Sequence, residues 1–314
     1  MASLGVTRAG EAPKGEFAWP VKTRDIHNWI FISKLWDEFD FRDDDIIIGT
    51  WGKSGTTWVQ QIVGQLIFNG QADLPVADMS PWLDMAILPE NIVDIVKAQT
   101  HRRFIKTHLP LDALTFSPRA KYLYVARDGR DSVWSLHNHH ANFTAEFYEI
   151  YRNNPRRGPD PGPCFRPPTP DIVEYFREWL YWGGYPLWPF WENIRTWWAA
   201  RDLPNVMLVH FARLKADLAG QMRRIASFLD IPIDEARWPA IVEYCTFDYM
   251  KAYPEHATPL GGALWQGGAA TFIYKGTNER WRNQLTADDI RAYERRAREE
   301  LGEECAHWLA TGEV

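Results

Sequence analysis

The sequence predicts an α/β fold: a single domain in which a central parallel sheet is flanked by helices. Three observations lead to this fold class. Short apolar runs without alternation indicate strands that are buried on both faces. Segments with helical periodicity separate these runs, so that strands and helices alternate along the chain. A strand, a glycine-containing loop and a helix follow one another near residue 50.

The expected strands are short segments rich in β-branched or aromatic residues: 45–50, 104–107, 122–126 and 206–211. Apolar residues at helical spacing predict helices over residues 57–68, 131–140 and 215–229. A last helix begins at Thr286, whose hydroxyl can cap it with Asp289 as capping-box partner. We therefore expect one domain over residues 1–314, with its core at about 41–285 and its C-terminal helix at about 286–302.

The composition excludes several classes of protein. A net charge of −6 argues against a nucleic-acid partner, and no stretch approaches the roughly 18 apolar residues that span a bilayer. The stretch from Met1 to Gly15 lacks the apolar centre of a signal peptide. Three cysteines (Cys164, Cys245 and Cys305) are too few for a disulfide framework, so a cytoplasmic location is predicted. The 17 Trp, 16 Phe and 12 Tyr indicate either an aromatic-lined pocket or an aromatic-rich core.

Two segments lack the pattern of a helix or a strand. Prolines in residues 153–170 are dense enough to prevent regular structure, which suits a domain linker or an excursion over a site. Because the α/β pattern continues after it, we interpret this segment as an excursion within one domain. Residues 261–268 are rich in glycine, and they suit a flexible connector or a lid that a ligand orders.

The first motif is a phosphate-binding strand–loop–helix that is similar to a P-loop. Lys53 and several hydroxyls follow the first strand, where a helix N-terminus offers free N–H groups to an anion. The ATP-binding pattern GxxxxGK[ST] fails, because its leading glycine would fall at Ile47. A polar turn capped by hydroxyls is the alternative interpretation.

Two further motifs follow strands. Arg127 comes at the carboxyl end of the third strand, where open α/β sheets bind ligands, and Ser135 follows eight residues later. Both side chains could reach one phosphate, although an ion pair between Arg127 and Asp131 is an equal alternative. His108 ends the second strand just before Pro110, where a neutral imidazole could remove a proton from a hydroxyl. A lone histidine is more often structural.

Together these motifs resemble the cytosolic-type sulfotransferase family that depends on 3′-phosphoadenosine 5′-phosphosulfate (PAPS). The family's strings match Lys53–Trp58 and Lys106–Pro110, and its spaced Arg and Ser match Arg127 and Ser135. The resemblance runs from about Phe41 to Leu285 and includes residues 41–45 and 245–250. The specific signal is the order of the motifs, since no single motif would suffice.

The resemblance implies a role for each matching residue. His108 would be the general base, Lys53 would stabilise the leaving group, and Lys106 would assist near the transferring sulfuryl group. PAPS would be the donor, 3′-phosphoadenosine 5′-phosphate (PAP) its product, and no metal is implied. The residues expected to hold the nucleotide are Lys53, Ser54, Gly55, Thr56, Thr57, Trp58, Arg127, Ser135, Phe211, Thr246, Phe247, Lys275 and Gly276.

The sequence departs from the family pattern at three positions. Gly52 replaces a proline, and Phe211 replaces a tyrosine whose hydroxyl contact with the adenine is lost. Tyr274 replaces an arginine, which leaves the site for the 3′-phosphate one charge poorer unless another group compensates. The family's dimerisation motif is not recognisable, so the oligomeric state stays open.

The expected acceptor is a small, hydrophobic alcohol or phenol. Aromatic and apolar residues could form its pocket, although each could equally be a core residue: Phe17, Trp19, Trp82, Leu83, Met85 and Tyr249.

Two other functions compete with sulfuryl transfer. A small-molecule kinase with a P-loop would use ATP and Mg²⁺, but the displaced glycine at Ile47 weighs against it. A nucleotide-binding protein without catalysis would have no need to retain both Lys53 and His108.

Overall fold

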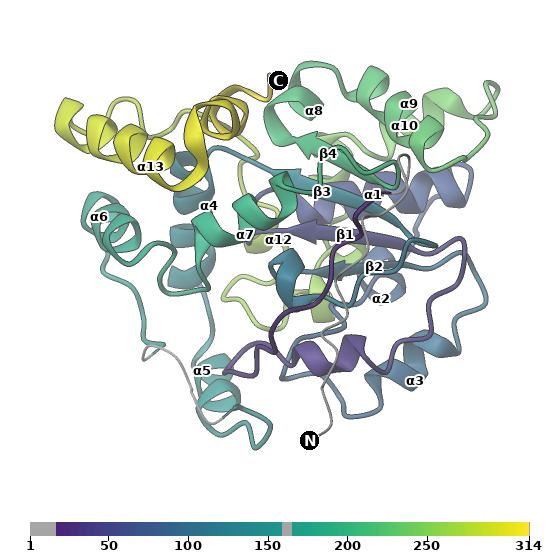
Figure 1. Ribbon diagram of the computed structural model, residues 1–314, viewed down its shortest axis with the longest axis horizontal. Coiled ribbons are helices and arrows are strands. Elements are labelled where there is room, and N and C mark those ends of the chain that lie inside the picture. The colour runs from purple at the N-terminus through teal and green to yellow at the C-terminus, as the bar shows by residue number, and fades with distance from the viewer. Residues whose placement is uncertain (1–16, 159–164, 314) are drawn as a thin grey trace, which may run out of the picture.

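Four parallel strands form one sheet in the computed structural model, which describes residues 17–158 and 165–313. The strands are β1 (Ile46–Thr50), β2 (Phe104–Thr107), β3 (Lys121–Ala126) and β4 (Val206–His210), and their order is β2-β1-β3-β4. Figure 1 shows this sheet at the centre of the molecule, with helices around it. The predicted α/β class with a parallel sheet is confirmed. Outside the described residues lie two parts of the sequence discussed above: the stretch from Met1 to Gly15, and residues 159–164 of the proline-rich segment, which include Cys164.

The helices are α1 (Thr56–Ile67), α2 (Val76–Met79), α3 (Ile92–Lys97), α4 (Gly129–Ala141), α5 (Ala145–Arg152), α6 (Ile172–Trp182), α7 (Phe190–Trp198), α8 (Phe211–Ala216), α9 (Leu218–Phe228), α10 (Trp238–Glu243), α11 (Phe247–Ala252), α12 (Ala269–Phe272) and α13 (Ala287–Thr311). Short 3₁₀ turns are η1 (Ser33–Trp36), η2 (Leu111–Ala113), η3 (Pro254–His256) and η4 (Pro259–Gly262). In the described part of the chain, none of the helices is long and apolar enough to cross a membrane.

Both faces of the sheet are covered, which explains why its strands are apolar without alternation. Ile46 and Ile48 of β1 point to the face packed by α1 and α9, where Ile62 and Met222 lie. Ile47 points to the opposite face, which belongs to the larger aromatic core with α4, α6, α7 and α13. The sheet is therefore the middle of three layers.

Gly49 lets a tryptophan of α7 lie directly against β1. A Cβ atom at this position would be 2.5 Å from the ring of Trp197, which is much closer than any real contact. The Trp197 indole also donates a hydrogen bond of 3.1 Å to the carbonyl of Leu109, just beyond β2. The helix is thereby fixed against the ends of two neighbouring strands.

A buried ion pair fixes the start of β1 to the start of β2. Asp45 and Arg103 are almost fully buried. Arg103 Nε and Nη2 donate to the two carboxylate oxygens of Asp45 at 2.7 and 2.5 Å, and Nη2 also donates to the carbonyl of Asp40 at 2.8 Å. The Arg103 guanidinium lies 4.4 Å from the ring centroid of Phe39. The charge of each partner is therefore balanced by the other inside the protein.

Some element boundaries differ from those predicted, because polar side chains cap helices locally. The expected strand 206–211 ends at His210, whose Nδ1 accepts from the N–H of Ala212 and so begins α8. The expected helix 215–229 is two helices, since Asp217 ends α8 and its carboxylate accepts from Gly220 N to cap α9.

The C-terminal helix is longer than predicted. Its capping box of Thr286 and Asp289 is present as expected. Gly302, at the expected end, has a left-handed φ of 76°, but the helix resumes after it and reaches Thr311. Burial of Trp308 and Leu309 in the core favours the part of the helix that follows Gly302.

Replacing Asp45 by Asn should lower the free energy of unfolding by about 3–5 kcal/mol, because Arg103 would keep a buried charge without a counter-ion. Urea unfolding at neutral pH measures this change. The matched control is Asp43→Asn, whose exposed pair with Arg119 should be worth at most about 1 kcal/mol. Equal losses in the two variants would contradict a special role for the buried pair.

Candidate active site

The carboxyl ends of β1, β2 and β3 lie side by side at one edge of the sheet. Strand β1 pairs with β2 on one side and with β3 on the other, so the chain reverses its direction of winding here. Crevices at such a point are where open α/β sheets bind ligands. The loop 51–55, His108 and Arg127 follow these three strand ends, so the three predicted motifs meet at this edge.

The loop between β1 and α1 leaves the N-terminus of a helix open. Gly55 is the N-cap of α1, and no side chain caps the helix. The φ of Gly55 is +115°, and a Cβ atom here would lie 2.9 Å from the ring of Phe211. Lys53 also has a positive φ, of 65°. This tight turn therefore exposes backbone N–H groups and the positive end of the helix dipole to an anion.

Lys53 lies in the cavity above this loop. Its Nζ is 3.1 Å from Nδ1 of His139 on α4, and 4.6 Å from the ring centroid of Phe272. Burial, together with the positive charges of Arg127 and Lys106, lowers the pKa of Lys53 to about 7. An anion bound beside these three cations would reverse that effect.

Lys106 brings a second ammonium group to the same edge from β2. Its side chain is 9% exposed. Burial lowers the pKa of Lys106 to about 8, while the charge of Asp84 acts in the opposite direction. Two lysines with lowered pKa values therefore face one cavity.

His108 is held so that one ring nitrogen is free. Its Nδ1 lies 2.8 Å from the carbonyl oxygen of Thr50. A carbonyl can only accept, so we assign the proton to Nδ1, which leaves the lone pair on Nε2. Burial, followed by the charge of Lys106, lowers the pKa of His108 to about 3, so the imidazole is neutral at pH 7. Asn193 Nδ2 donates to the carbonyl of His108 at 2.9 Å and fixes its backbone.

A buried carboxylate that the sequence did not single out lies beneath these groups. Asp84 is fully buried and accepts hydrogen bonds from the indole N–H of Trp36 at 2.7 Å and from the hydroxyl of Thr107 at 2.5 Å. It also accepts from the indole N–H of Trp82, whose ring centroid lies 4.5 Å from that of His108 in a T-shaped arrangement. Burial raises the pKa of Asp84 to about 6, although these hydrogen bonds lower it. Its only signal in the sequence is a carboxylate within an apolar stretch.

Arg127 is fixed by the C-terminal segment and not by Asp131. Its Nη2 donates to Asn278 Oδ1 at 2.8 Å and to the Thr277 carbonyl at 2.9 Å, and its guanidinium lies 4.2 Å from the ring centroid of Phe211. Asp131 instead accepts from the backbone N–H of Glu279 at 2.6 Å. The ion pair between Arg127 and Asp131 that the sequence left open is therefore absent from the described residues.

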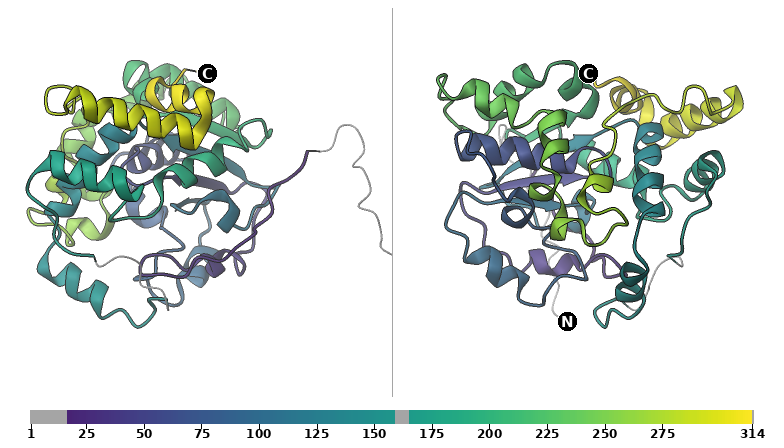
Figure 2. Two further views of the ribbon diagram at one scale, coloured as in Figure 1. Left: turned by 60° about the vertical axis from the view of Figure 1, so that its left-hand side comes forward. Right: turned by 180° about the vertical axis from the view of Figure 1, so that it is seen from behind.

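The segment after α12 closes over the side of the cavity at which Arg127 lies. Gly276 has a φ of +59°, and a Cβ atom there would lie 2.7 Å from the ring of Phe247. Its carbonyl accepts a hydrogen bond of 2.9 Å from Nζ of Lys215. Figure 2 (right) shows the yellow-green segment around α12 lying in front of the sheet when the molecule is seen from behind.

One cavity of about 850 Å³ joins most of the predicted residues. It is lined by both lysines and His108 and, among the residues expected to hold the nucleotide, by Gly55, Thr56, Thr57, Trp58, Arg127, Ser135, Phe211, Thr246, Phe247, Lys275 and Gly276. Ser54 belongs to the same loop, but its side chain is buried and does not line the cavity. The cavity therefore has a polar, cationic end and, beyond His108, an apolar end.

The pocket residues expected for the acceptor are only partly brought together. Trp82 and Met85 line the cavity, whereas the other four do not. Leu83 is fully buried in the core, and Tyr249 packs between Tyr244 and Tyr253. Phe17 is half exposed beside Trp19, which itself stacks on Phe116.

The apolar end is formed instead by aromatic residues that the sequence did not indicate. They come from segments far apart in the chain: Trp29, His139, Phe143, Phe147, Phe165, Trp188, Trp265 and Phe272. Trp265 belongs to the glycine-rich segment 261–268, and Phe165 to the described part of 153–170. Both segments thus contribute to the wall of the cavity.

Known proteins with similar sequences identify the family of this chain. The profile of the family described as "Sulfotransferase domain" matches residues 43–304. A glycolipid sulfotransferase of Mycobacterium bovis is 34% identical over 88% of this chain and 91% of its own length. Human sulfotransferase 2B1 is 28% identical over 83% of this chain and 67% of its own.

Two solved structures share the fold. Mouse sulfotransferase SULT7A1 complexed with PAP has a TM-score of 0.65 and 20% identity over 87% of this chain and 90% of its own. Retinol dehydratase in a complex with retinol and PAP has a TM-score of 0.64 and 23% identity over 86% of this chain and 84% of its own. Because the domain profile covers most of the chain and the mycobacterial relative matches nearly all of it, this protein belongs to the sulfotransferase family.

Proposed function

We propose that the protein transfers the sulfuryl group of PAPS to the hydroxyl group of an apolar acceptor. The observation that carries this proposal is the meeting of Lys53, Lys106 and His108 in one cavity, between a cationic end and an aromatic end. The PAP bound in the related structures, and the order of motifs in the sequence, support PAPS as the donor.

The nucleotide occupies the cationic end in this proposal. The open N-terminus of α1 and the hydroxyls of Thr56 and Thr57 hold the 5′-phosphosulfate. Arg127, Ser135 and Lys275 bind the 3′-phosphate, since a guanidinium can grip a phosphate through two N–H donors. The adenine lies near the rings of Trp58 and Phe247, because flat bases stack on aromatic side chains.

Transfer then needs one base and one group that stabilises the leaving oxygen. His108 Nε2 takes the proton of the acceptor hydroxyl while its oxygen forms a bond to sulfur. The bond from sulfur to the bridging phosphate oxygen breaks, and that oxygen leaves with the PAP. Lys53 moves from His139 to the bridging oxygen, where it stabilises charge that develops only in the transition state. Lys106 neutralises the sulfuryl oxygens from the other side.

The acceptor binds at the aromatic end in this proposal. The wall there offers rings and aliphatic side chains, with few groups that could recognise a strongly polar molecule. Ile95 and Leu260 line the cavity and are also exposed, so apolar surface continues to its rim. The names of the relatives point the same way, since one is a glycolipid sulfotransferase and another protein was solved with retinol. An amphiphilic or largely apolar alcohol fits best.

A thermal-shift comparison of nucleotides tests the donor. PAP without metal should raise the melting temperature more than ATP with Mg²⁺, and ligand at 100 times its Kd stabilises by about 2.7 kcal/mol. Transfer from PAPS should also be unchanged by EDTA, because a sulfuryl group carries less charge than a phosphoryl group. Stabilisation by ATP and Mg²⁺ alone, with activity lost in EDTA, would establish the kinase alternative instead.

His108→Ala should reduce kcat by roughly 10²- to 10⁴-fold, the usual contribution of a general base, while the Kd for PAP stays nearly unchanged. Steady-state kinetics with a hydroxylated apolar acceptor and PAP titration measure the two effects. His307→Ala is the matched control, since His307 is exposed on α13 and does not line the cavity. Near-normal turnover of the His108 variant would refute the assignment.

The affinity for PAP should fall as the pH rises from about 7 to 9. Lys53 and Lys106, with pKa values of about 7 and 8, lose their protons over this range in the free protein, so binding an anion requires proton uptake. PAP titrations at fixed ionic strength measure this dependence, above the pH at which the phosphates themselves titrate. Lys53→Arg should flatten the curve, because arginine stays charged. An affinity independent of pH would show that neither lysine binds the nucleotide in its charged form.

A further inference from the structure

Tyr274 stands where the family pattern has an arginine, and two cations lie close to its ring. Lys275 Nζ lies 5.0 Å from the centroid of the Tyr274 ring, and the Arg280 guanidinium lies 5.7 Å from it. A cation at this range is attracted by the electrons of the ring. Both Lys275 and Arg280 also line the cavity that contains Arg127 and Ser135.

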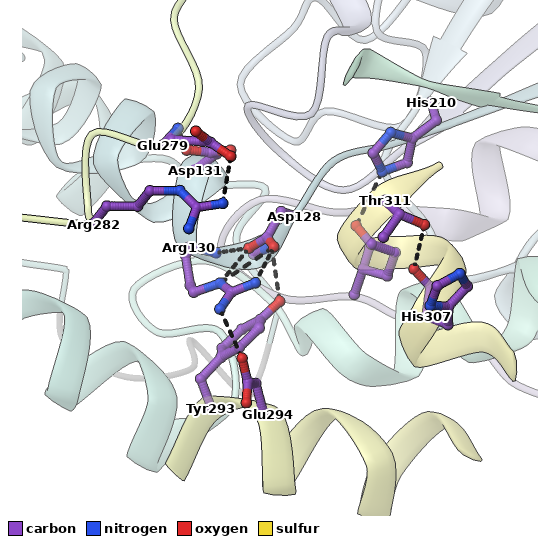
Figure 3. A network of polar contacts seen from close by, with 12 residues as sticks. Asp128, Arg130, Asp131, His210, Glu279, Arg282, Tyr293, Glu294, His307 and Thr311 are labelled. Carbon is purple, nitrogen blue, oxygen red and sulfur yellow. Dashed lines mark hydrogen bonds and ion pairs between the residues drawn. The ribbon is translucent and has the colours of Figure 1, made fainter. Parts of the chain in front are cut away.

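Arg280 differs from its neighbours because no carboxylate of the described residues pairs with it directly. Burial lowers the pKa of Arg280, and the charges of Tyr274 and Asp131 only act in the opposite direction. Figure 3 shows Arg130 paired with Asp128 and Glu294, and Arg282 paired with Glu279. Over residues 17–158 and 165–313, the Arg280 side chain has no ion pair and no hydrogen bond. Its Nε is buried and still lacks a partner. A buried donor of a charged group without a partner is costly, and a ligand can supply that partner.

Arg280 and Arg127 act on one another electrostatically. The pKa of Arg127 is about 10, because burial and the charge of Arg280 lower it while the charge of Asp131 raises it. Arg127 already donates from Nε and Nη2 to Asn278 and Thr277. The guanidinium of Arg127, which already donates several hydrogen bonds, therefore lies in the electric field of the Arg280 guanidinium, which donates none to the described part of the chain. Two like charges held together in this way favour an anion between them.

We propose that Arg280 is a ligand of the donor's 3′-phosphate and supplies there the charge that Tyr274 does not. This inference rests on the proposed function, because the 3′-phosphate is taken to lie beside Arg127 and Ser135. The guanidinium of Arg280 reaches the anion from six residues further along the chain than Tyr274. The Tyr274 ring keeps it at the cavity wall, so this tyrosine acts as a positioning residue.

The experiment compares the Kd of PAP with that of adenosine 5′-phosphate, which lacks only the 3′-phosphate. Arg280→Gln should weaken PAP by about 10- to 100-fold, the range for a lost hydrogen bond to a charged group, and leave adenosine 5′-phosphate within about twofold. Arg282→Gln is the matched control, since Arg282 is exposed, paired with Glu279 and outside this cavity. The Arg282 variant should change neither the Kd of PAP nor the Kd of adenosine 5′-phosphate.

Restoring the charge elsewhere gives a second, independent readout. The double variant Tyr274→Arg/Arg280→Gln should recover most of the affinity for PAP, because a guanidinium returns to the same end of the cavity. Arg280→Lys should keep part of the affinity, since it retains the charge without the forked donors. Failure of the double variant to recover, in a protein with wild-type melting behaviour, would overturn the charge-replacement argument.

The outcomes separate this inference from the proposed function. If the wild-type protein binds PAP no better than adenosine 5′-phosphate, the donor assignment itself is wrong. If the wild type prefers PAP and Arg280→Gln preserves that preference, only the role of Arg280 is refuted. A loss that is equal for both nucleotides also refutes it, because the arginine would then act on the whole site.

Discussion

The site depends on cations that are held together away from water and without enough carboxylates to balance them. Lys53, Lys106 and Arg127 come from three different strand ends, and burial lowers the pKa of each one. The fold stabilises this arrangement through contacts remote from the cavity, such as the pair of Asp45 and Arg103 at the opposite ends of β1 and β2. The order of the strands therefore places these positive charges together without counter-ions. An anionic ligand would offset the electrostatic free energy that this arrangement costs.

One aromatic residue links several parts of this arrangement. Phe211 lies against Gly55 in the loop, below the guanidinium of Arg127, and edge-on to Trp58. It stands where the family pattern has a tyrosine, so its ring keeps the packing role although the hydroxyl is gone. Gly55 in turn must be glycine both for its positive φ and for the close approach of this ring. Loop, helix and arginine are therefore positioned by one side chain.

The sequence predicted the fold class, and it indicated residues that the fold brings into one cavity, because both depend on local patterns. Buried strands are apolar runs, and Lys53, His108 and Arg127 each follow such a run directly. Asp84, beneath the cavity, and His139 and the aromatic wall, which line it, were missed, because only contacts between distant segments bring them to the site. The same cause explains the displaced pocket candidates, since nothing local distinguishes Leu83 in the core from Met85 in the cavity. Helix boundaries changed where Asp217 and His210 cap the chain through their own side chains.

In the proposed reaction, the low basicity of His108 makes proton transfer depend on the bound donor. Its pKa of about 3 arises from burial and from the neighbouring lysines, so in the empty cavity this imidazole is a poor proton acceptor. The negative charge of a bound donor offsets Lys106 and Lys53 and thereby raises the affinity of Nε2 for a proton. Deprotonation of an alcohol is then favoured only while the group to be transferred is present. In this proposal, departure of the nucleotide makes the imidazolium unstable again, so His108 releases its proton and returns to its neutral starting state.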